Sequence, residues 1–146
     1  MAATSALMYI WSLPQFQRAL AAHVAPDVDL GVQTLVRHLG MFGAQLPSHL
    51  GVALGMTRSN VSKIVRRAEA HGLVTREPVD RDGRSILVDL SPAGDVLAAQ
   101  ILHSGDEMMR EMTRGWSREE LRDWTRLSHR LANAAAEYAQ KIINAH

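Results

Sequence analysis

The stretch that decides the fold is LPSHLGVALGMTRSNVSKIVRRAEAHGLVTREPVDRDGRSILVDLSPAGD, residues 46–95. Near its start, residues 47–54 predict a short helix that ends at Gly55. Thr57 is a good N-cap for a second helix. At the end of this helix, His71 supplies a side chain that can carry positive charge, and Gly72 can adopt the left-handed conformation that stops a helix. Within this second helix the apolar residues recur at the i, i+3, i+4 and i+7 spacing of one buried stripe, which comprises Val61, Ile64, Val65 and Ala68.

After the second helix the pattern changes to that of a β-hairpin. Residues 73–77 and 85–90 predict two strands, and the second strand carries its apolar side chains on one face. The segment between them, residues 79–84, reads VDRDGR and contains the Asp and Gly residues that turns need. Two helices joined by a tight turn and followed by a hairpin form a winged helix-turn-helix.

Two helices are predicted before this stretch. The first covers residues 5–24, and Pro14 is expected to kink it or to start a new turn because proline lacks the N–H that would bond back. The second covers residues 29–40, with Asp29 as its N-cap. The N-terminal part of the chain is therefore expected to be entirely helical.

Two longer helices are predicted after the hairpin. Ser91-Pro92 opens the first, with Ser as the cap and Pro at the first helical position, and Gly115 ends it. A capping box at residues 117–120 opens the last helix, which is expected to reach residue 145. The predicted fold is mostly α with a small β-wing.

The composition is that of one folded domain, or one domain with extensions, in a chain of 146 residues with a net charge of +1. Cysteine is absent, which excludes disulfides, thiolate zinc sites and cysteine nucleophiles. Residues 38–57 carry no charge, but glycines and Pro47 interrupt them, which argues against a membrane span. A secretory signal would require a basic residue before its apolar run, and none precedes the apolar N-terminal run here. We therefore expect a cytoplasmic protein with no membrane partner.

The second helix of the quoted stretch has a polar, cationic outer face. With the apolar stripe buried, Ser59, Lys63 and Arg66 point directly away from the core. The side chains that flank them are those of Arg58, Asn60, Ser62 and Arg67. Residues 57–84 contain seven basic and four acidic residues, whereas residues 106–144 contain seven of each. Positive charge is therefore concentrated around the helix-turn-helix, as in proteins that bind nucleic acid.

This face has the side chains that double-stranded DNA requires. The major groove, about 12 Å wide, admits one α-helix, in which Arg can bond guanine and Asn can bond adenine. The residues expected to contact or approach bases are Arg58, Ser59, Asn60 and Lys63. Those expected to hold phosphates are Ser48, Thr57, Ser62, Arg66, Arg67 and Arg81.

Residues 46–95 resemble the winged helix-turn-helix core of the MarR family of bacterial transcription regulators. The similar motifs are LGMTRSNVSKIV in the second helix, EAHGLV before the wing, DRDGRS at the wing tip and LSPAG entering the next helix. The flanking helices agree with the family in order and length only. Gly51 and Ala68 depart from the pattern, because the family usually has Ala and Leu there, and this difference can thin the helix packing.

The resemblance implies a homodimer that binds a pseudo-palindromic operator. Residues 1–28 and 92–146 would form the helical dimerisation region, and residues 29–91 the DNA-binding region. In that family the Arg of the wing motif enters the minor groove, and Asp82-Gly83-Arg84 aligns with the motif, which assigns this role to Arg84 beside Asp82.

The family also commonly binds small aromatic or phenolic effectors between the dimer helices and the DNA-binding lobe. The residues of this chain that could line such an apolar pocket are Tyr9, Trp11, His38, Met41 and Phe42. The same residues suit ordinary core or dimer packing, so the two interpretations stay open at this point.

No other chemistry is indicated by the sequence. The seven histidines include no i, i+3 or i, i+4 pair, and no arrangement of nucleophile and base is present, so neither a metal site, a cofactor nor an enzyme is expected. The predicted function is that of a homodimeric DNA-binding transcriptional regulator, a repressor, with relief by a small-molecule effector as an open option. The alternative is a winged-helix module that binds another protein and not DNA, and the salt dependence of binding would separate the two.

Overall fold

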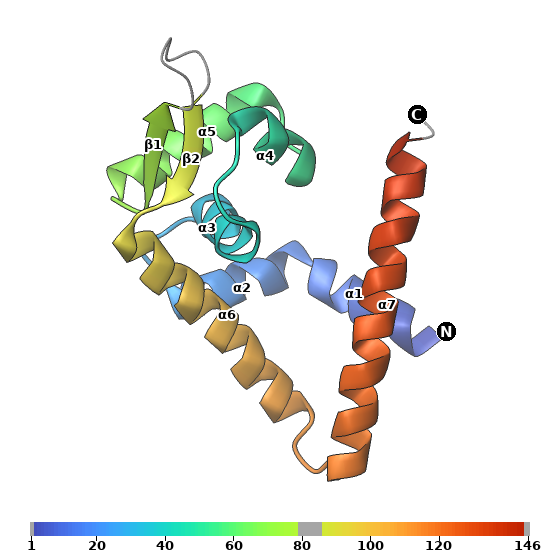
Figure 1. The fold of residues 1–146 in the computed structure, drawn as a ribbon. Coiled ribbons are helices and arrows are strands. Elements are labelled where there is room, and N and C mark those ends of the chain that lie inside the picture. Colours follow the sequence, from blue (N-terminus) through green and yellow to red (C-terminus); the bar gives the residue numbers. More distant parts are fainter. Residues whose placement is uncertain (1, 79–85, 145–146) are drawn as a thin grey trace. The chain divides into compact units, whose positions relative to one another are not determined.

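The computed structural model describes residues 2–78 and 86–144 and has two compact units, residues 1–106 and 107–146. The described residues form seven helices and one two-stranded sheet (Figure 1). In chain order the elements are α1 (Ala2–Ser12), α2 (Pro14–Val24), α3 (Leu30–Phe42), α4 (Pro47–Ala53), α5 (Arg58–Ala70), β1 (Val74–Pro78), β2 (Ile86–Leu90), α6 (Pro92–Met112) and α7 (Arg118–Asn144). The predicted winged helix-turn-helix fold is confirmed.

Helix starts follow the predicted caps. The Asp29 side chain accepts a hydrogen bond from the Val32 N–H at 3.1 Å, and the Thr57 hydroxyl accepts one from the Asn60 N–H at 3.3 Å. The predicted helix over residues 5–24 is two helices, because Leu13 is extended and Pro14 begins α2. Proline therefore interrupts the predicted helix completely at this point.

Helix α3 lies at the centre of the first unit, between α2 and the elements of the helix-turn-helix (Figure 1). Its side chains Leu35 and Val36 are fully buried, and they form one core with Leu50 of α4 and Val88 of β2. The apolar stripe of α5 completes this core, since its four residues are at most 8% exposed. The core therefore fixes which face of α5 remains outside.

A buried glutamine joins α2 to α3. The Gln33 side chain is 4% exposed, and its amide nitrogen lies 2.8 Å from the Ala21 carbonyl oxygen, 2.9 Å from that of Ala25 and 2.8 Å from that of Val28. The carbonyl of Ala25 directly follows α2, and that of Val28 lies in the connection to α3. One amide group thus bonds three backbone acceptors at the end of α2 and in the connection to α3, two of which, Ala21 and Ala25, also accept backbone N–H groups.

The hairpin is antiparallel, with Val74 opposite Leu90 and Pro78 opposite Ile86. A third segment is added at Gln45, whose N–H donates to the Val88 carbonyl at 3.0 Å and whose carbonyl accepts from the Val88 N–H at 2.9 Å. This bridge connects the loop between α3 and α4 to the base of the wing. The sequence pattern did not predict it.

The start of α6 is fixed to the start of the hairpin. The Ser91 hydroxyl donates to the Gly72 carbonyl at 2.5 Å and accepts from the Gly94 N–H at 3.1 Å, which confirms Ser91 as the cap. A Cβ atom on Gly94 would lie 2.0 Å from the Leu73 carbonyl oxygen. Only glycine permits this approach, so the direction in which α6 leaves the winged helix is set by backbone contact.

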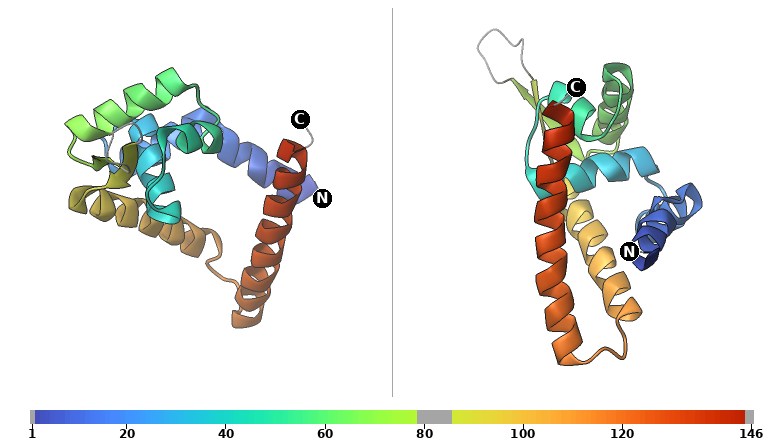
Figure 2. Two further views of the ribbon diagram at one scale, coloured as in Figure 1. Left: turned by 45° about the horizontal axis from the view of Figure 1, so that its top comes forward. Right: turned by 90° about the vertical axis from the view of Figure 1, so that its right-hand side faces the viewer.

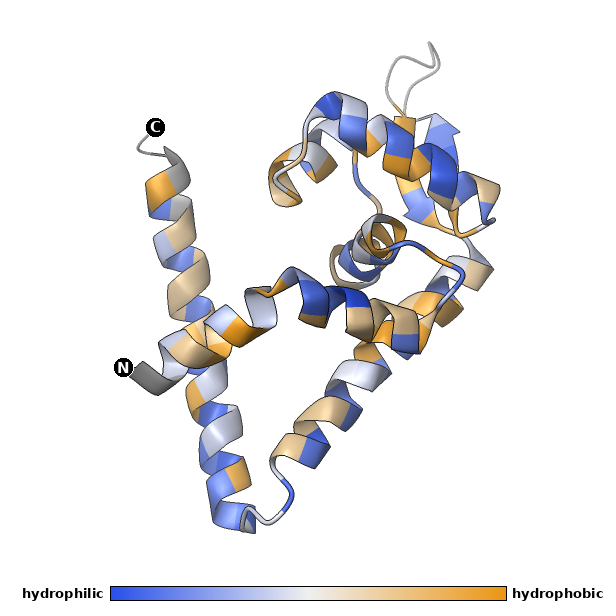
Figure 3. Ribbon diagram, turned by 180° about the vertical axis from the view of Figure 1, so that it is seen from behind, coloured by the Kyte–Doolittle hydropathy of each residue, from blue (hydrophilic) through white to orange (hydrophobic). Residues whose placement is uncertain are grey.

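The second unit contains the end of α6 and all of α7. The capping box is present, since the Ser117 N–H donates to a Glu120 carboxylate oxygen at 2.7 Å and the Glu120 N–H donates to the Ser117 hydroxyl at 3.2 Å. Trp116 packs edge-on against Trp124, with ring centroids 5.9 Å apart. Apolar and polar residues alternate along α7 (Figure 3), and among its described side chains none is buried.

Candidate nucleic-acid interface

The outer face of α5 is exposed. All seven polar residues that the sequence placed there are exposed, namely Arg58, Ser59, Asn60, Ser62, Lys63, Arg66 and Arg67. The opposite face is held by Val61 and Val65, each 2% exposed, so α5 cannot rotate to hide these side chains without opening the core. Thr57, the N-cap, and Ser48, in the first turn of α4, are exposed as well.

The turn between α4 and α5 brings the two helices close together. Gly55 adopts a φ of 61°, in the left-handed region that favours glycine, and the Met56 N–H donates to the Gly51 carbonyl at 2.8 Å. A Cβ on Gly51 would lie 3.2 Å from the Met56 carbonyl oxygen and 3.8 Å from a methyl carbon of Val61. Glycine at this position therefore suits a tight α4–α5 contact, which Figure 2 shows from two further directions.

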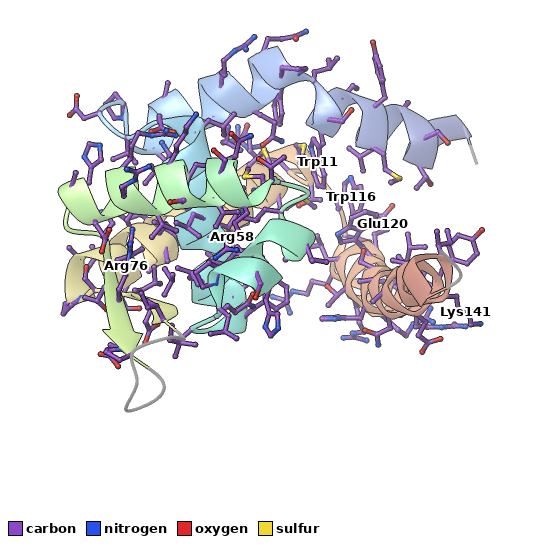
Figure 4. All side chains as sticks on the ribbon, turned by 90° about the horizontal axis from the view of Figure 1, so that it is seen from above. Trp11, Arg58, Arg76, Trp116, Glu120 and Lys141 are labelled. Atoms are coloured by element: carbon purple, nitrogen blue, oxygen red, sulfur yellow. The ribbon has the colours of Figure 1, made fainter. Side chains whose placement is uncertain are left out.

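A cationic hollow of about 160 Å³ lies where α4, α5 and the hairpin meet. Its lining consists of Pro47, Arg58, Ser62, Val65, Arg76 and Ile86. Two of these, Arg58 and Ser62, were predicted as DNA contacts, whereas Arg76 on β1 was not singled out. Figure 4 labels Arg58 and Arg76. By the alternation of side chains along β1, Arg76 shares the face of the buried Val74, so the sequence could have placed it on the side of the strand that packs on the core.

Arg76 is fixed by a neighbour on α5. Its guanidinium forms an ion pair with the Glu69 carboxylate at 2.7 Å, and both side chains are about one third exposed. The hairpin is thereby tied to the last part of α5. The hollow consequently combines one guanidinium held by this ion pair, one hydroxyl and the exposed guanidinium of Arg58.

The other end of the α5 outer face carries an ion pair that the sequence did not indicate. The Arg67 guanidinium donates two hydrogen bonds to Asp29, from Nε to Oδ2 at 2.9 Å and from Nη2 to Oδ1 at 3.1 Å. Burial raises the pKa of the Asp29 carboxyl, but the hydrogen bonds from Arg67 and the Val32 N–H outweigh burial, so the pKa lies below its ordinary value. Because the pairing favours the charged form of each partner, the pKa of Arg67 is raised.

Comparison with known proteins identifies this architecture. The MarR family model matches residues 34–85, from the middle of α3 through the wing. A search of curated proteins found no match. Among solved structures, a probable transcriptional regulator from Pseudomonas aeruginosa is 28% identical, with 80% of this chain and 89% of that chain covered and a TM-score of 0.57.

Two further structures share the fold at lower identity. The apo form of MarR from E. coli is 19% identical over 85% of this chain and 93% of its own, with a TM-score of 0.65. A transcriptional regulator from Thermotoga maritima is 17% identical over 92% of this chain and 97% of its own, with a TM-score of 0.66. Residues 34–85 thus match the MarR family, and the solved structures share the fold of the chain. Members of the MarR family are transcriptional regulators and not enzymes, and this chain has the regulator fold.

The wing tip was expected to contain three contact residues. Arg81, Asp82 and Arg84 lie outside the described residues. The strands that carry the tip are in place, in the register given above. The roles of the three residues stay predictions.

The five residues expected to line an effector pocket have mixed surroundings. The His38 ring lies 4.8 Å from the Phe42 ring, and its Nε2 lies 3.2 Å from Oε1 of Gln45. Tyr9, Met41 and Phe42 are each more than half exposed, and Trp11 is half-buried. His38 and Phe42 therefore lie together beside the Gln45–Val88 bridge, and the assignment of the set to an effector stays a prediction.

Within residues 2–78 and 86–144 there is no cluster of three or more His, Asp or Glu side chains that could hold a metal ion. No helix among the described residues is both long and apolar enough to span a bilayer.

Proposed function

We propose that this MarR-family protein is a homodimeric transcriptional repressor that binds a short pseudo-palindromic operator. The observation that carries the proposal is the fixed, exposed polar face of α5, whose opposite face is sealed in the core. A bacterial regulator of this kind acts in the cytoplasm, where the chromosome lies.

Helix α5 is the recognition helix of the proposal. Its first two turns enter the major groove, where Arg58, Ser59, Asn60 and Lys63 contact or approach base edges. A bidentate Arg–guanine or Asn–adenine pair discriminates between bases by about 1–3 kcal/mol. The hydroxyls and guanidiniums that surround these residues hold phosphates, and they are those of Ser48, Thr57, Ser62, Arg66 and Arg81.

The wing supplies the minor-groove contact. Arg84 inserts into the minor groove with Asp82 beside it, as the wing motif of the family implies, and a narrow A·T groove attracts an arginine by its negative potential. We expect Arg84→Ala to weaken operator binding strongly and to leave the melting temperature nearly unchanged. An Arg84→Ala variant with full operator affinity would contradict the wing assignment.

The second copy is expected to bind through the helices outside the winged helix. The exposed apolar residues of α7 recur along one face, at Leu121, Trp124, Leu127, Leu131, Tyr138 and Ile142. A face of this kind on a helix of 27 residues favours burial against another chain. Two linked recognition helices can then contact half-sites about 34–36 Å apart. In this arrangement residues 29–91 bind DNA, and residues 1–28 and 92–146 form the dimer.

Control by a small molecule would work through the dimer. A small aromatic or phenolic effector that binds better to a form with wrongly spaced recognition helices would reduce the population that can bind the operator. Tyr9, Trp11, His38, Met41 and Phe42 are the candidates for its pocket. Titration of the protein–operator complex with such compounds tests this part of the proposal.

Selection of bound duplexes from a random DNA pool tests the function as a whole. We expect recovery of an inverted repeat with half-sites one helical turn apart. Affinity for that duplex should fall by orders of magnitude between about 50 and 200 mM salt, because phosphate contacts release counterions. Failure to enrich any duplex would instead support the alternative, a winged-helix module that binds another protein.

A further inference from the structure

The Asp29–Arg67 ion pair connects two helices that are distant in sequence. Asp29 precedes α3 and Arg67 lies in the last turn of α5, and the two residues are 38 positions apart. Their side chains are 44% and 49% exposed, so water and salt screen the pair. Its two parallel hydrogen bonds nevertheless fix the direction of the guanidinium plane as well as its distance.

Asp29 is itself held in place by α3. One carboxylate oxygen, Oδ1, accepts both the Val32 N–H at 3.1 Å and the Arg67 Nη2–H at 3.1 Å. The negative charge also lies at the positive end of the α3 dipole. The carboxylate is therefore a fixed point of α3, and Arg67 attaches the end of α5 to it.

Gly31 lies beside the ion pair, on the side that faces α5. A Cβ on Gly31 would lie 3.1 Å from Asp29 Oδ1, 3.4 Å from Arg67 Nη2 and 3.4 Å from the terminal methyl carbon of Ile64. A Cβ here would require Asp29 Oδ1 to shift by a few tenths of an ångström and would contact Arg67 and Ile64 at about the van der Waals distance. The pair thus belongs to the packed contact between α3 and α5.

The position of the pair determines its effect on the opposite end of α5. Arg67 lies nine residues after Arg58, which is about 13 Å along a helix. A tilt of about 5° at the Arg67 end would displace the Arg58 end by about 1 Å, which exceeds the tolerance of a precise binding site. The buried stripe fixes the rotation of α5, whereas the ion pair restrains the end where its buried residues stop at Ala68.

We infer that Asp29 and Arg67 are positioning residues for DNA recognition, and that Arg67 acts through Asp29 rather than by holding a phosphate. This inference rests on the proposed DNA binding. It predicts an effect of unusual sign, because removal of an acidic residue from a DNA-binding protein ordinarily strengthens binding to the polyanion. Here the removal of Asp29 should weaken operator binding.

The test compares two matched pairs of variants in the full-length protein. Asp29→Ser keeps a capping oxygen for α3 but is too short to bond Arg67, and Asp27→Ser removes the same charge from an exposed acid with no ion pair among the described residues. Arg67→Ala and Arg66→Ala remove neighbouring arginines of one helix. Affinity for the selected operator and for a scrambled duplex is measured by fluorescence anisotropy at several salt concentrations, after circular dichroism has confirmed folding.

If Asp29 and Arg67 position α5, four results are expected for these variants. Asp29→Ser and Arg67→Ala each lower operator affinity about tenfold, the size of one lost base contact, and leave affinity for the scrambled duplex nearly unchanged. The double variant is no weaker than either single variant, because both remove the same contact. The salt dependence keeps its slope in Arg67→Ala, whereas in Arg66→Ala the slope falls by about 0.9 per lost phosphate contact. Asp27→Ser binds the operator as well as the unchanged protein or better.

The inference is overturned if Asp29→Ser binds the operator as tightly as Asp27→Ser, or if Arg67→Ala lowers the salt slope as Arg66→Ala does. Equal losses for operator and scrambled duplex would also overturn it, because they would indicate a general loss of charge or of folded protein. If the unchanged protein binds neither duplex, the proposed function fails, and the inference fails with it. These outcomes are therefore distinguishable.

Discussion

The winged helix and helix α7 differ in the burial of their apolar side chains. In the winged helix Leu35, Leu50 and Val88 are fully buried among side chains of the same chain. Along α7 the large apolar residues remain exposed, from 37% at Trp124 to 67% at Tyr138. Both regions contain helices with side-chain caps, so helix capping does not account for the difference.

The difference shows which part of the chain needs a partner. The winged helix closes its own core, and its exposed face is polar, as expected for a surface that meets nucleic acid. Helix α7 leaves one apolar face uncovered over its length, and its charged residues occupy the opposite face. The first region is thus built to fold by itself, whereas the second favours assembly.

The largest effect should come from a cavity in the winged-helix core. Leu35→Ala removes a fully buried side chain at the centre of α3 and should lower the free energy of unfolding by about 2–5 kcal/mol, as measured by urea denaturation. Val52→Ala provides the contrast, since Val52 is 76% exposed and its truncation should change stability by less than about 0.5 kcal/mol. Similar losses for both would mean that the core is not where the structure places it.

A charge on the apolar face of α7 should act on assembly instead. Leu131→Asp changes a residue that is 59% exposed in the single chain and should weaken the proposed dimer by about 2 kcal/mol, or roughly thirtyfold, in sedimentation equilibrium. Asn133→Asp adds the same charge on the opposite side of the helix and should leave the dimer unchanged. If Leu131→Asp also leaves it unchanged, another surface joins the two copies.

Local signals in the sequence predicted most of the elements. Asp29 and Thr57 were predicted as caps and the apolar stripe of α5 as buried, because capping and helical periodicity depend on residues within a few positions. Helix α3 is longer than predicted and continues past Gly40. The structure shows why: a Cβ at Gly40 would lie 2.7 Å from the Cβ of Ala98, so this glycine permits close packing inside a helix rather than ending one.

Contacts between distant positions were not predictable in the same way. The Asp29–Arg67 pair, the Gln45–Val88 bridge and the Glu69–Arg76 pair join segments whose approach depends on the packing of whole elements. For the site, the sequence identified the exposed face of α5 correctly. The phosphate contact of Arg67 stays a prediction made from its residue type, and its neighbour Asp29 was not predicted, since nothing local indicates that an acid 38 positions earlier lies beside it.

The two regions also differ in how their caps are enclosed. Ser91 is buried and bonds both the Gly94 N–H and the Gly72 carbonyl, so Ser91→Ala should cost about 1–2 kcal/mol of unfolding free energy. Ser117, the cap of α7, is exposed, and Ser117→Ala should cost about 0.5–1 kcal/mol. Thermal unfolding of both variants measures the difference. A larger loss at Ser117 would reverse the comparison.

The smallest effect concerns one carboxylate in each region. The pKa of Asp29 is lowered because bonds from Arg67 and Val32 outweigh burial, whereas the pKa of Glu120 is lowered by its bonds with Ser117. In an NMR titration Arg67→Ala should therefore raise the pKa of Asp29 toward its ordinary value of 3.8 and leave that of Glu120 unchanged.

The same substitution gives a stability difference with a defined pH dependence. A carboxyl with a lowered folded-state pKa stabilises the fold above its unfolded pKa, and this stabilisation is lost as the pH falls through the folded pKa. The unfolding free energies of the parent and Arg67→Ala should differ by less than about 1 kcal/mol at neutral pH, because water screens the pair, and should converge below the ordinary pKa of Asp29. A difference that persists in acid would mean that Arg67 stabilises α5 through its aliphatic stem and not through Asp29.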